Sequence, residues 1–349
     1  MQPDVVSTTL VGPTIPTTLA DALRSVAGIV DRSLVLWTGA SELHDEVETT
    51  SLSASDKTVV IEWPWRNDFG AGRQAALDFA TKTGATWCLW LDSDEWIEPH
   101  GEDVRGAMLA TDAAAMLMFD ERGEYLQPRA IRLPCAARWE GRTHEAIPVT
   151  GPRFVSARFC SRPKALCDLL AKHRRDLVIL LEETRKQPED ARWWYYLGDA
   201  LAGLRRFLDA LDAFRRCADL RGWDEQSAWA CYRAANLLLF EFGQFEAAID
   251  LCAQGMARHP GIAELPWLAG IAAQRLGRHE HAVWWAELAR VHGEKAPEPV
   301  RALDRRRLFR VPKGLREGPS DIERFSFAVL GEPDATCAAI TEFKRWQGQ

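Results

Sequence analysis

The sequence predicts a two-part chain: an α/β domain with a Rossmann-like sheet, followed by an all-α domain of helical repeats. The chain has 349 residues, a length that fits two domains of ordinary size. Short apolar runs alternate with helix-like segments up to about residue 160, whereas helical periodicity continues alone from about residue 165. We therefore place the α/β domain at 1–160, the repeats at 161–295 and a C-terminal capping segment at 296–349.

Composition excludes several classes of protein. Lys and Arg number 43 against 50 Asp and Glu, which gives a net charge of −7 and argues against a protein that coats nucleic acid. No apolar run is long enough to span a membrane, and the N-terminal residues have no secretory pattern. The eight cysteines form no C-x-x-C pair, which argues against a zinc site. We expect a cytoplasmic protein.

Strands and helices alternate in the first domain. The last strand is apolar throughout, as is typical of a strand buried on both faces. The order β-α-β-β-α-β predicts a mostly parallel sheet with helices on both sides, and ligands bind such sheets at the carboxyl ends of the strands. The expected strands are 7–14, 32–39, 58–65 and 85–92, and the expected helices are 18–30 and 69–84.

The second domain repeats a helix-turn-helix unit. Small or polar residues recur with spacings of 38 and 34, and a set of alanines keeps the same two spacings. This period, with a small residue at position 8 and Ala at position 20, resembles the tetratricopeptide repeat; a generic helical bundle is the alternative. The recurring residues are Gly198, Asn236 and Gly270 in one set and Ala210, Ala248 and Ala282 in the other.

An acidic motif follows the most apolar strand. Asp92, Asp94 and Glu95 place three carboxylates within four residues, and such a cluster repels itself unless a cation is near. Oxygen ligands at i and i+2 suit Mg²⁺ or Mn²⁺. The alternative is an acidic turn that caps a helix starting near Gly101.

A basic residue stands where a helix disfavours it. Arg73 falls in the first turn of the helix that begins near Phe69, and the helix dipole there favours an anion. A bound phosphate would remove the conflict. The alternative is an ion pair of Arg73 with Asp68 or Glu62.

Three motifs together resemble a known family. Segments 65–77 (WRNDFGAGRQAAL), 84–95 (GATWCLWLDSDE) and 139–145 (WEGRTHE) are similar to family 2 glycosyltransferases of the GT-A fold, and above all to bacterial members with tetratricopeptide repeats after the catalytic domain. The likeness covers most of residues 18–290. It implies a divalent cation, Mn²⁺ or Mg²⁺, held by the D-x-D motif on the diphosphate of a nucleotide sugar.

The resemblance also assigns roles to single residues. It makes Asp94 the direct metal ligand, Asp92 a ligand of the ribose or the metal, and Arg73 the arginine of an F-x-x-x-R-N motif, in which Gln74 replaces the usual Asn. Thr38 joins the donor-binding residues, although the family's V-D-T-G-S run is here Leu36-Trp37-Thr38-Gly39, and the usual K-N-E after the first strand is replaced by residues 12–16. Both departures concern donor recognition.

His144 and Glu145 fall where the family has a His-Glu pair. An inverting transfer needs a base for the acceptor proton, and we assign Glu145 as that base and His144 as a metal or diphosphate contact. The exchanged roles remain open, Glu140 is a further candidate base, and His144 as a hydrogen-bonded structural histidine is the alternative.

The resemblance implies a metal-dependent, inverting, hexosyltransferase-type enzyme. The donor would be a nucleotide sugar, a UDP-sugar first, and the acceptor a protein or peptide; a homodimer is a further option, and no nucleic acid is involved. A catalytically inactive domain that serves a repeat-based interaction module is the alternative, and a nucleotidyltransferase a third. Part of the repeat aromatics is expected to line a groove for the acceptor: Trp193, Trp194, Tyr195, Tyr196, Trp229 and Tyr232.

Overall fold

The computed structural model describes residues 4–99, 103–120, 123–294, 312–315 and 317–347. These residues divide into two compact units, and the second begins at Ala165. The boundary expected from the sequence lay after residue 160. Most of the predicted capping segment is described as helix, whereas 296–311 lies outside the described residues. Each unit is considered by itself below.

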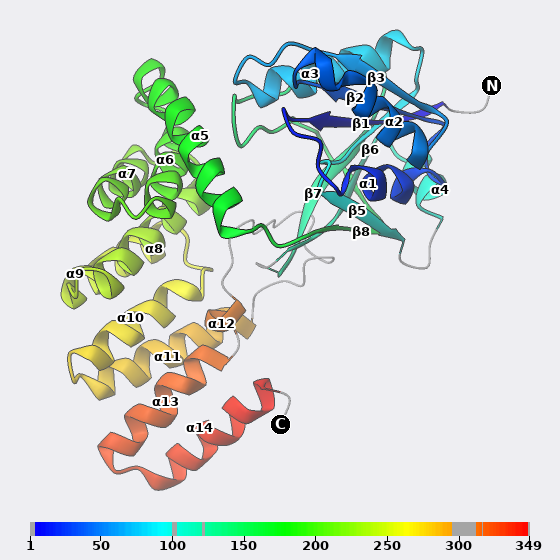
Figure 1. Cartoon of the computed structure of the whole chain (residues 1–349). Coiled ribbons are helices and arrows are strands. Elements are labelled where there is room, and N and C mark those ends of the chain that lie inside the picture. Colours follow the sequence, from blue (N-terminus) through cyan, green and yellow to red (C-terminus); the bar gives the residue numbers. More distant parts are fainter. Residues whose placement is uncertain (1–3, 100–102, 121–122, 295–311, 316, 348–349) are drawn as a thin grey trace. The chain divides into compact units, whose positions relative to one another are not determined.

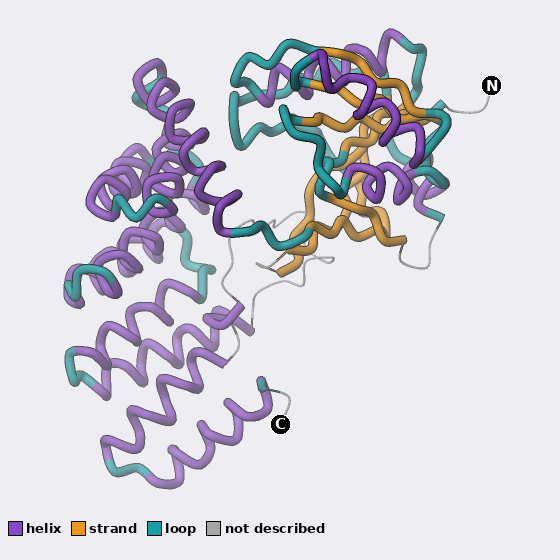
Figure 2. Tube along the Cα trace, in the orientation of Figure 1, coloured by secondary structure: helices purple, strands orange, loops and turns teal. Residues whose placement is uncertain are grey.

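The first unit is built on one mixed sheet (Figures 1 and 2). Its described strands lie in the order β3-β2-β1-β4-β7-β6-β8-β5. Strands β1 to β4 run parallel to one another, and β6 runs parallel to β8. Strand β7 runs antiparallel to β4 and to β6, and β5 runs antiparallel to β8. The strands are β1 (Val5–Val11), β2 (Arg32–Trp37), β3 (Thr58–Glu62), β4 (Trp87–Trp90), β5 (Glu95–Pro99), β6 (Ala113–Asp120), β7 (Gly123–Arg132) and β8 (Arg153–Ser161).

The parallel part of the sheet follows the prediction, and the rest differs from it. The four expected strands correspond to β1 to β4. Beyond them the sheet also contains antiparallel pairs, because β6 and β7 follow each other closely in the chain and pair as a hairpin, which forces them to run antiparallel, whereas β6 and β8 pair parallel. Strands β5 to β8 were not predicted at all. The sheet is therefore mixed, and an antiparallel strand borders β4.

Helices cover both faces of the sheet. Leu89 of β4 packs in one apolar cluster with Val26 of α1 and Met108 of α4, whereas its neighbour Trp90 packs in another with Leu77 of α3. Burial on both faces explains the continuous apolar run, since each such side chain contributes about 1.5–3 kcal/mol when removed from water. The helices are α1 (Leu19–Val26), α2 (His44–Ala54), α3 (Phe69–Lys82) and α4 (Val104–Leu109), with a 3₁₀ turn at Ser41–Leu43.

The second unit consists of helices throughout its described residues (Figure 2). Successive helices pack against each other in pairs, such as α6 with α7, α8 with α9 and α10 with α11. None of the described helices is long and apolar enough to cross a membrane. The helices are α5 (Leu166–Lys186), α6 (Ala191–Gly203), α7 (Phe207–Leu220), α8 (Asp224–Phe240), α9 (Phe245–Arg258), α10 (Glu264–Arg275), α11 (His279–Glu294), α12 (Pro312–Leu315), α13 (Glu317–Leu330) and α14 (Pro333–Trp346).

The repeat positions lie where the helices of each pair meet. Ala210, Ala248 and Ala282 are completely buried. At Gly198 an added Cβ would lie 2.6 Å from the ring of Phe214 on α7, so only glycine lets α6 and α7 approach this closely. The helix-pair interpretation of the spacing is thus confirmed, and its small residues serve the packing of consecutive helices.

Most of the aromatic set is core rather than groove. Trp193, Tyr195, Trp229 and Tyr232 are each at most 5% exposed, and the rings of Trp229 and Tyr232 stack with centroids 4.4 Å apart. The two remaining members of the predicted set, Trp194 and Tyr196, are partly buried. The groove hypothesis therefore narrows to these two side chains.

The packing at Gly198 can be tested by adding one methyl group. Glycine to alanine inside a helix ordinarily stabilises by about 1 kcal/mol, but Gly198→Ala should destabilise the second unit by about 1–3 kcal/mol, because the Phe214 ring is fully buried and has no space to yield. Denaturant unfolding measures the difference. A Gly198→Ala variant that is more stable than the parent would contradict the packing described.

Candidate functional site

The start of α3 positions Arg73. Asp68 caps the helix, and its side chain accepts a hydrogen bond of 2.8 Å from the backbone N–H of Ala71. Asn67, just before the cap, has a φ of 53°. With its start fixed in this way, the helix carries Arg73 to the carboxyl end of β4, where the acidic motif begins.

A loop after β7 closes over the start of α3. Phe69 donates its backbone N–H to the carbonyl of Arg142 at 2.9 Å, and a Cβ on Gly70 would lie only 2.3 Å from the carbonyl oxygen of Gly141. Gln74 also holds the loop, because its Oε1 accepts the backbone N–H of Trp139 at 3.0 Å. Gln74, which replaces the usual Asn of the F-x-x-x-R-N motif, thus helps to position this loop. The loop carries His144 and Glu145.

Arg73 joins two of the predicted residues by ion pairs. Its Nη2 lies 2.5 Å from Oδ1 of Asp92, and its Nε lies 2.5 Å from Oε1 of Glu145. The guanidinium also lies 5.2 Å from the centroid of the Trp139 ring. Arg73 is therefore ion-paired, as the alternative to a bound phosphate expects. Its partners are Asp92 and Glu145, however, and not Asp68 or Glu62.

Charges in this cluster shift the ionisation of its members. Burial acts to lower the pKa of Arg73, but the carboxylates of Asp92 and Glu145 raise that pKa above its usual value, so the guanidinium stays charged. Burial acts to raise the pKa of Asp92, yet the positive charge of Arg73, aided by Arg129 and Lys164, holds that pKa below its usual value. Asp92 is therefore ionised at neutral pH.

A second ion pair lies beside the first. Arg129 of β7 contacts Glu95 through two hydrogen bonds of 2.8 Å, and both side chains are almost fully buried. Burial raises the pKa of Glu95 despite the nearby charge of Arg129. The sequence indicates Glu95 only as part of the acidic motif and does not single out Arg129. An arginine within a strand is the available signal, but the strand β7 that carries it is not among the four strands that the sequence predicts.

These side chains line one cavity of about 220 Å³. It brings together four of the six predicted site residues, and it combines carboxylates, guanidinium groups, an imidazole and an amide with two indole rings. Trp90 and Trp139 meet edge to face, with centroids 5.2 Å apart. Such a lining offers both donors and acceptors to a small polar ligand. The lining residues are Arg73, Trp90, Asp92, Glu95, Met118, Gln127, Arg129, Trp139, His144 and Glu145.

Two predicted residues lie outside the lining of this cavity. Asp94 pairs with Lys164, whose Nζ lies 3.0 Å from its Oδ2. Thr38 is buried and donates its hydroxyl to the carbonyl of Val11 at 2.8 Å. Its neighbour Trp37 is 1% exposed and donates its Nε1–H to the carbonyl of Ala40. This indole fills the core where the family motif has an acidic side chain.

The acidic turn does not cap a helix directly. Strand β5 starts at Glu95, and the following helix α4 begins only at Val104. A strand, and not a helix, therefore follows the acidic turn, which does not fit the alternative interpretation of the motif as a helix cap. Gly101, near which that helix was expected to start, lies outside the described residues.

The predicted metal ligands do not gather around one point. Asp92 and His144 line the cavity, whereas Asp94 faces Lys164, and Asp92 already pairs with Arg73. A hard divalent cation takes several oxygen ligands around one centre, and the ligand atoms of Asp92, Asp94 and His144 do not form a group that lies within 4.8 Å of one another.

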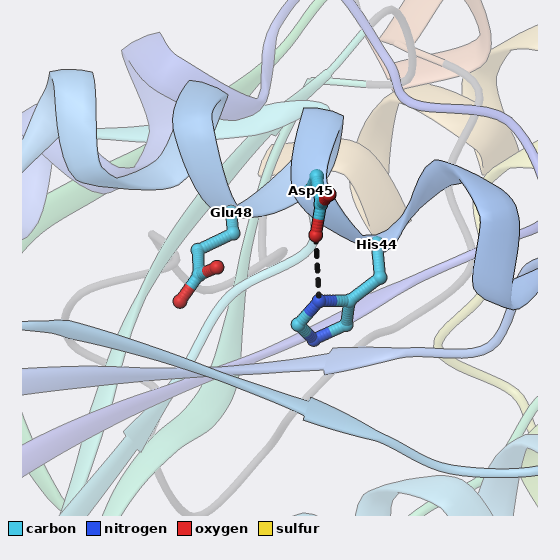
Figure 3. Close-up of side chains that lie close together, drawn as sticks. All are labelled: His44, Asp45 and Glu48. Carbon is cyan, nitrogen blue, oxygen red and sulfur yellow. Dashed lines mark ion pairs between the residues drawn. The ribbon is translucent and has the colours of Figure 1, made fainter.

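A different trio has the spacing of metal ligands. Within the described residues, ligand atoms of His44, Asp45 and Glu48 all lie within 4.8 Å of one another (Figure 3). The trio sits at the start of α2, and the side chain of Asp45 is fully exposed. Asp45 and Glu48 are exposed and His44 is half-buried. Exposed acidic groups are common without an ion, and none of the three residues lines the cavity.

The central ion pair predicts a specific loss of stability. Arg73→Met leaves the carboxylates of Asp92 and Glu145 without this cation. We expect a loss of about 2–3 kcal/mol at pH 7, less than the ~3–5 kcal/mol of a fully buried pair, because the Asp92 side chain is 40% exposed. The pKa of Asp92 is lowered in the folded state, so the stability that its ion pair contributes is present at neutral pH and is lost as the pH falls through that pKa. The difference in unfolding free energy between the parent and Arg73→Met should therefore shrink below about pH 4. Urea unfolding at pH 7 and below about pH 4 measures this difference. Arg138→Met, which removes an exposed pair with Asp78, should cost under about 1 kcal/mol; equal costs would refute the central role of Arg73.

Comparisons with known proteins bear on the helical half only. No family model matches the chain, and no curated protein matches it. Among solved structures, MamA 41-end from Desulfovibrio magneticus RS-1 is 18% identical, with a TM-score of 0.38 over 52% of this chain and 97% of that one. YrrB, described as a TPR protein with an unusual peptide-binding site, is 11% identical, with a TM-score of 0.39 over 53% and 82%. Likenesses this remote carry no functional argument, and neither protein is described as a glycosyltransferase.

Proposed function

We propose that the first unit transfers a sugar from a nucleotide-sugar donor and that the second unit binds a protein or peptide acceptor. One observation carries the proposal. Arg73, Asp92, His144 and Glu145 come from three separated segments of the sequence, and all four line the same cavity. Residues singled out for one chemistry meet at the carboxyl end of β4, which is the edge where such sheets bind ligands.

Each residue has a role in such a transfer. Glu145, in the cavity, is the base that accepts the proton of the acceptor hydroxyl or amide, and His144 on the same loop is the candidate for the exchanged role. Arg73 offers a planar fork of donors that matches phosphate oxygens, and it would bind the departing diphosphate after releasing one of its carboxylates. The indoles of Trp90 and Trp139 would pack against the sugar ring.

The direct experiment incubates the intact protein with a panel of nucleotide sugars, each with and without Mn²⁺. Donor hydrolysis and the shift of the thermal midpoint are measured together. The proposal expects one donor to raise the midpoint and to be hydrolysed. If no member of the panel does either, the transfer proposal fails. The arm without Mn²⁺ decides whether donor binding needs the cation.

The base assignment gives a separate prediction. Glu145→Gln should lower the transfer rate by about 10²- to 10⁴-fold with donor affinity nearly unchanged, because a base acts on the acceptor and not on the nucleotide. Glu46→Gln is the control, since Glu46 is exposed on α2 and does not line the cavity. If His144→Ala spares donor binding and abolishes turnover while Glu145→Gln stays active, the two roles are exchanged.

A second candidate function is an interaction module with an inactive first unit. Two observations favour it: Arg73 and Lys164 already neutralise the acidic residues expected to act on a donor, and the buried indole of Trp37 stands in place of a donor-binding acid. The helix pairs of the second unit would then carry the function by binding a partner protein, since stacked helix pairs offer extended binding surfaces. Failure of the whole donor panel, together with specific partner binding, would support this candidate.

Acceptor binding can be tested at the two partly buried aromatics. Trp194→Ser combined with Tyr196→Ser should reduce transfer to a protein acceptor by about tenfold or more while donor hydrolysis is retained. Trp346→Ser is the control, because that side chain is also aromatic and 43% exposed. Trp194 donates its Nε1–H to the carbonyl of Pro188, so the thermal midpoint must be followed. Equal loss of both activities would mean that the pair serves the fold instead.

A further inference from the structure

The Glu95–Arg129 pair lies in the cavity lining but has no part in the proposed chemistry. Its two hydrogen bonds join Nη1 to Oε2 and Nη2 to Oε1, each at 2.8 Å. The side chains of Arg129 and Glu95 are 5% and 8% exposed. A ligand in the cavity would therefore meet a pair whose strongest hydrogen bonds are already made within the chain.

Glu95 also closes the turn that carries Asp92. The backbone N–H of Asp92 donates to Oε2 of Glu95 at 2.8 Å, and the backbone N–H of Glu95 donates to the carbonyl of Asp92 at 3.1 Å. The same oxygen of Glu95 thus accepts from Asp92 and from Arg129. Any shift of the Glu95 carboxylate moves the backbone of Asp92 with it.

Arg129 is itself held firmly on the sheet. Its Nη2 contacts Oε1 of Gln127 at 3.1 Å and the sulfur of Met118 at 2.9 Å, and its guanidinium lies 4.6 Å from the centroid of the Phe159 ring. These contacts come from three different strands, β6, β7 and β8. The guanidinium is therefore a fixed point of the sheet, to which the turn after β4 is tied through Glu95.

Stability alone does not account for such a pair. Burying two charges costs several kcal/mol, and replacing both partners by uncharged groups is often neutral or stabilising. We propose that Glu95 and Arg129 are positioning residues: they fix the backbone of Asp92 so that its carboxylate meets Arg73 and faces the cavity. The inference rests on the proposed function for the identity of the ligand, and on geometry alone for the positioning.

The test separates positioning from stability. Glu95→Gln keeps the shape of the side chain but strands the charge of Arg129, so it should unfold more easily. In the double variant Glu95→Met, Arg129→Met both charges are gone, together with the oxygen that accepts the N–H of Asp92, and its thermal midpoint should return close to that of the parent. Donor affinity in the double variant should nevertheless stay about tenfold weaker or more, because small displacements of a binding group are costly.

A second measurement, made beside donor affinity, needs no ligand. Hydrogen–deuterium exchange of a peptide covering 91–96 should be about tenfold faster or more in the double variant, because the N–H of Asp92 loses its fixed acceptor. Arg132→Met on the same strand is the matched control: it breaks the exposed pair with Asp112 and should leave both readouts unchanged.

The outcomes distinguish the two proposals. A double variant with parental stability, parental exchange at 91–96 and parental donor affinity would overturn the positioning role. If the parent binds no donor of the panel, the proposed function fails, and the exchange at 91–96 alone decides whether the pair fixes Asp92.

Discussion

The arrangement of the candidate site depends on one buried guanidinium. Arg73 links the start of α3, the end of β4 and the loop after β7 through its pairs with Asp92 and Glu145. A charge with so little access to water must be neutralised within the protein, so the positions of these three segments are coupled. Two further contacts fix the segments that the guanidinium joins. Asp68 caps α3, and Gln74 accepts a hydrogen bond from the backbone of Trp139.

The parts of the fold that follow a simple period could be predicted from the sequence. The run through β4 is apolar at every position because both faces of the strand are covered, and the small residues of the second unit recur because each pair of helices meets in the same way. The polar residues at the end of β4 also pointed to the edge of the sheet at which the cavity lies. In each of these cases a local pattern carries the information.

The rest of the site depends on pairings that no local pattern records. Arg129 meets Glu95 across 34 residues and Arg73 meets Glu145 across 72, and such partners are known only once strand order and register are known. The antiparallel position of β7 beside β4 places Gln127 and Arg129 at the cavity. The sequence likewise suggests Asp94 as a candidate metal ligand but does not reveal its ion-pair partner Lys164, because the two residues are far apart in the chain.

The balance of charge in the cavity constrains what can enter it. Two guanidinium groups, of Arg73 and Arg129, face three carboxylates, of Asp92, Glu95 and Glu145, so the lining carries a formal charge of −1 with His144 neutral. A neutral ligand rich in hydroxyl groups can bind to this lining directly. A diphosphate must either bring a cation with it or draw Arg73 away from a carboxylate. The two possibilities differ in one measurable property, because only the first makes affinity for the phosphate part of a donor depend on a divalent cation.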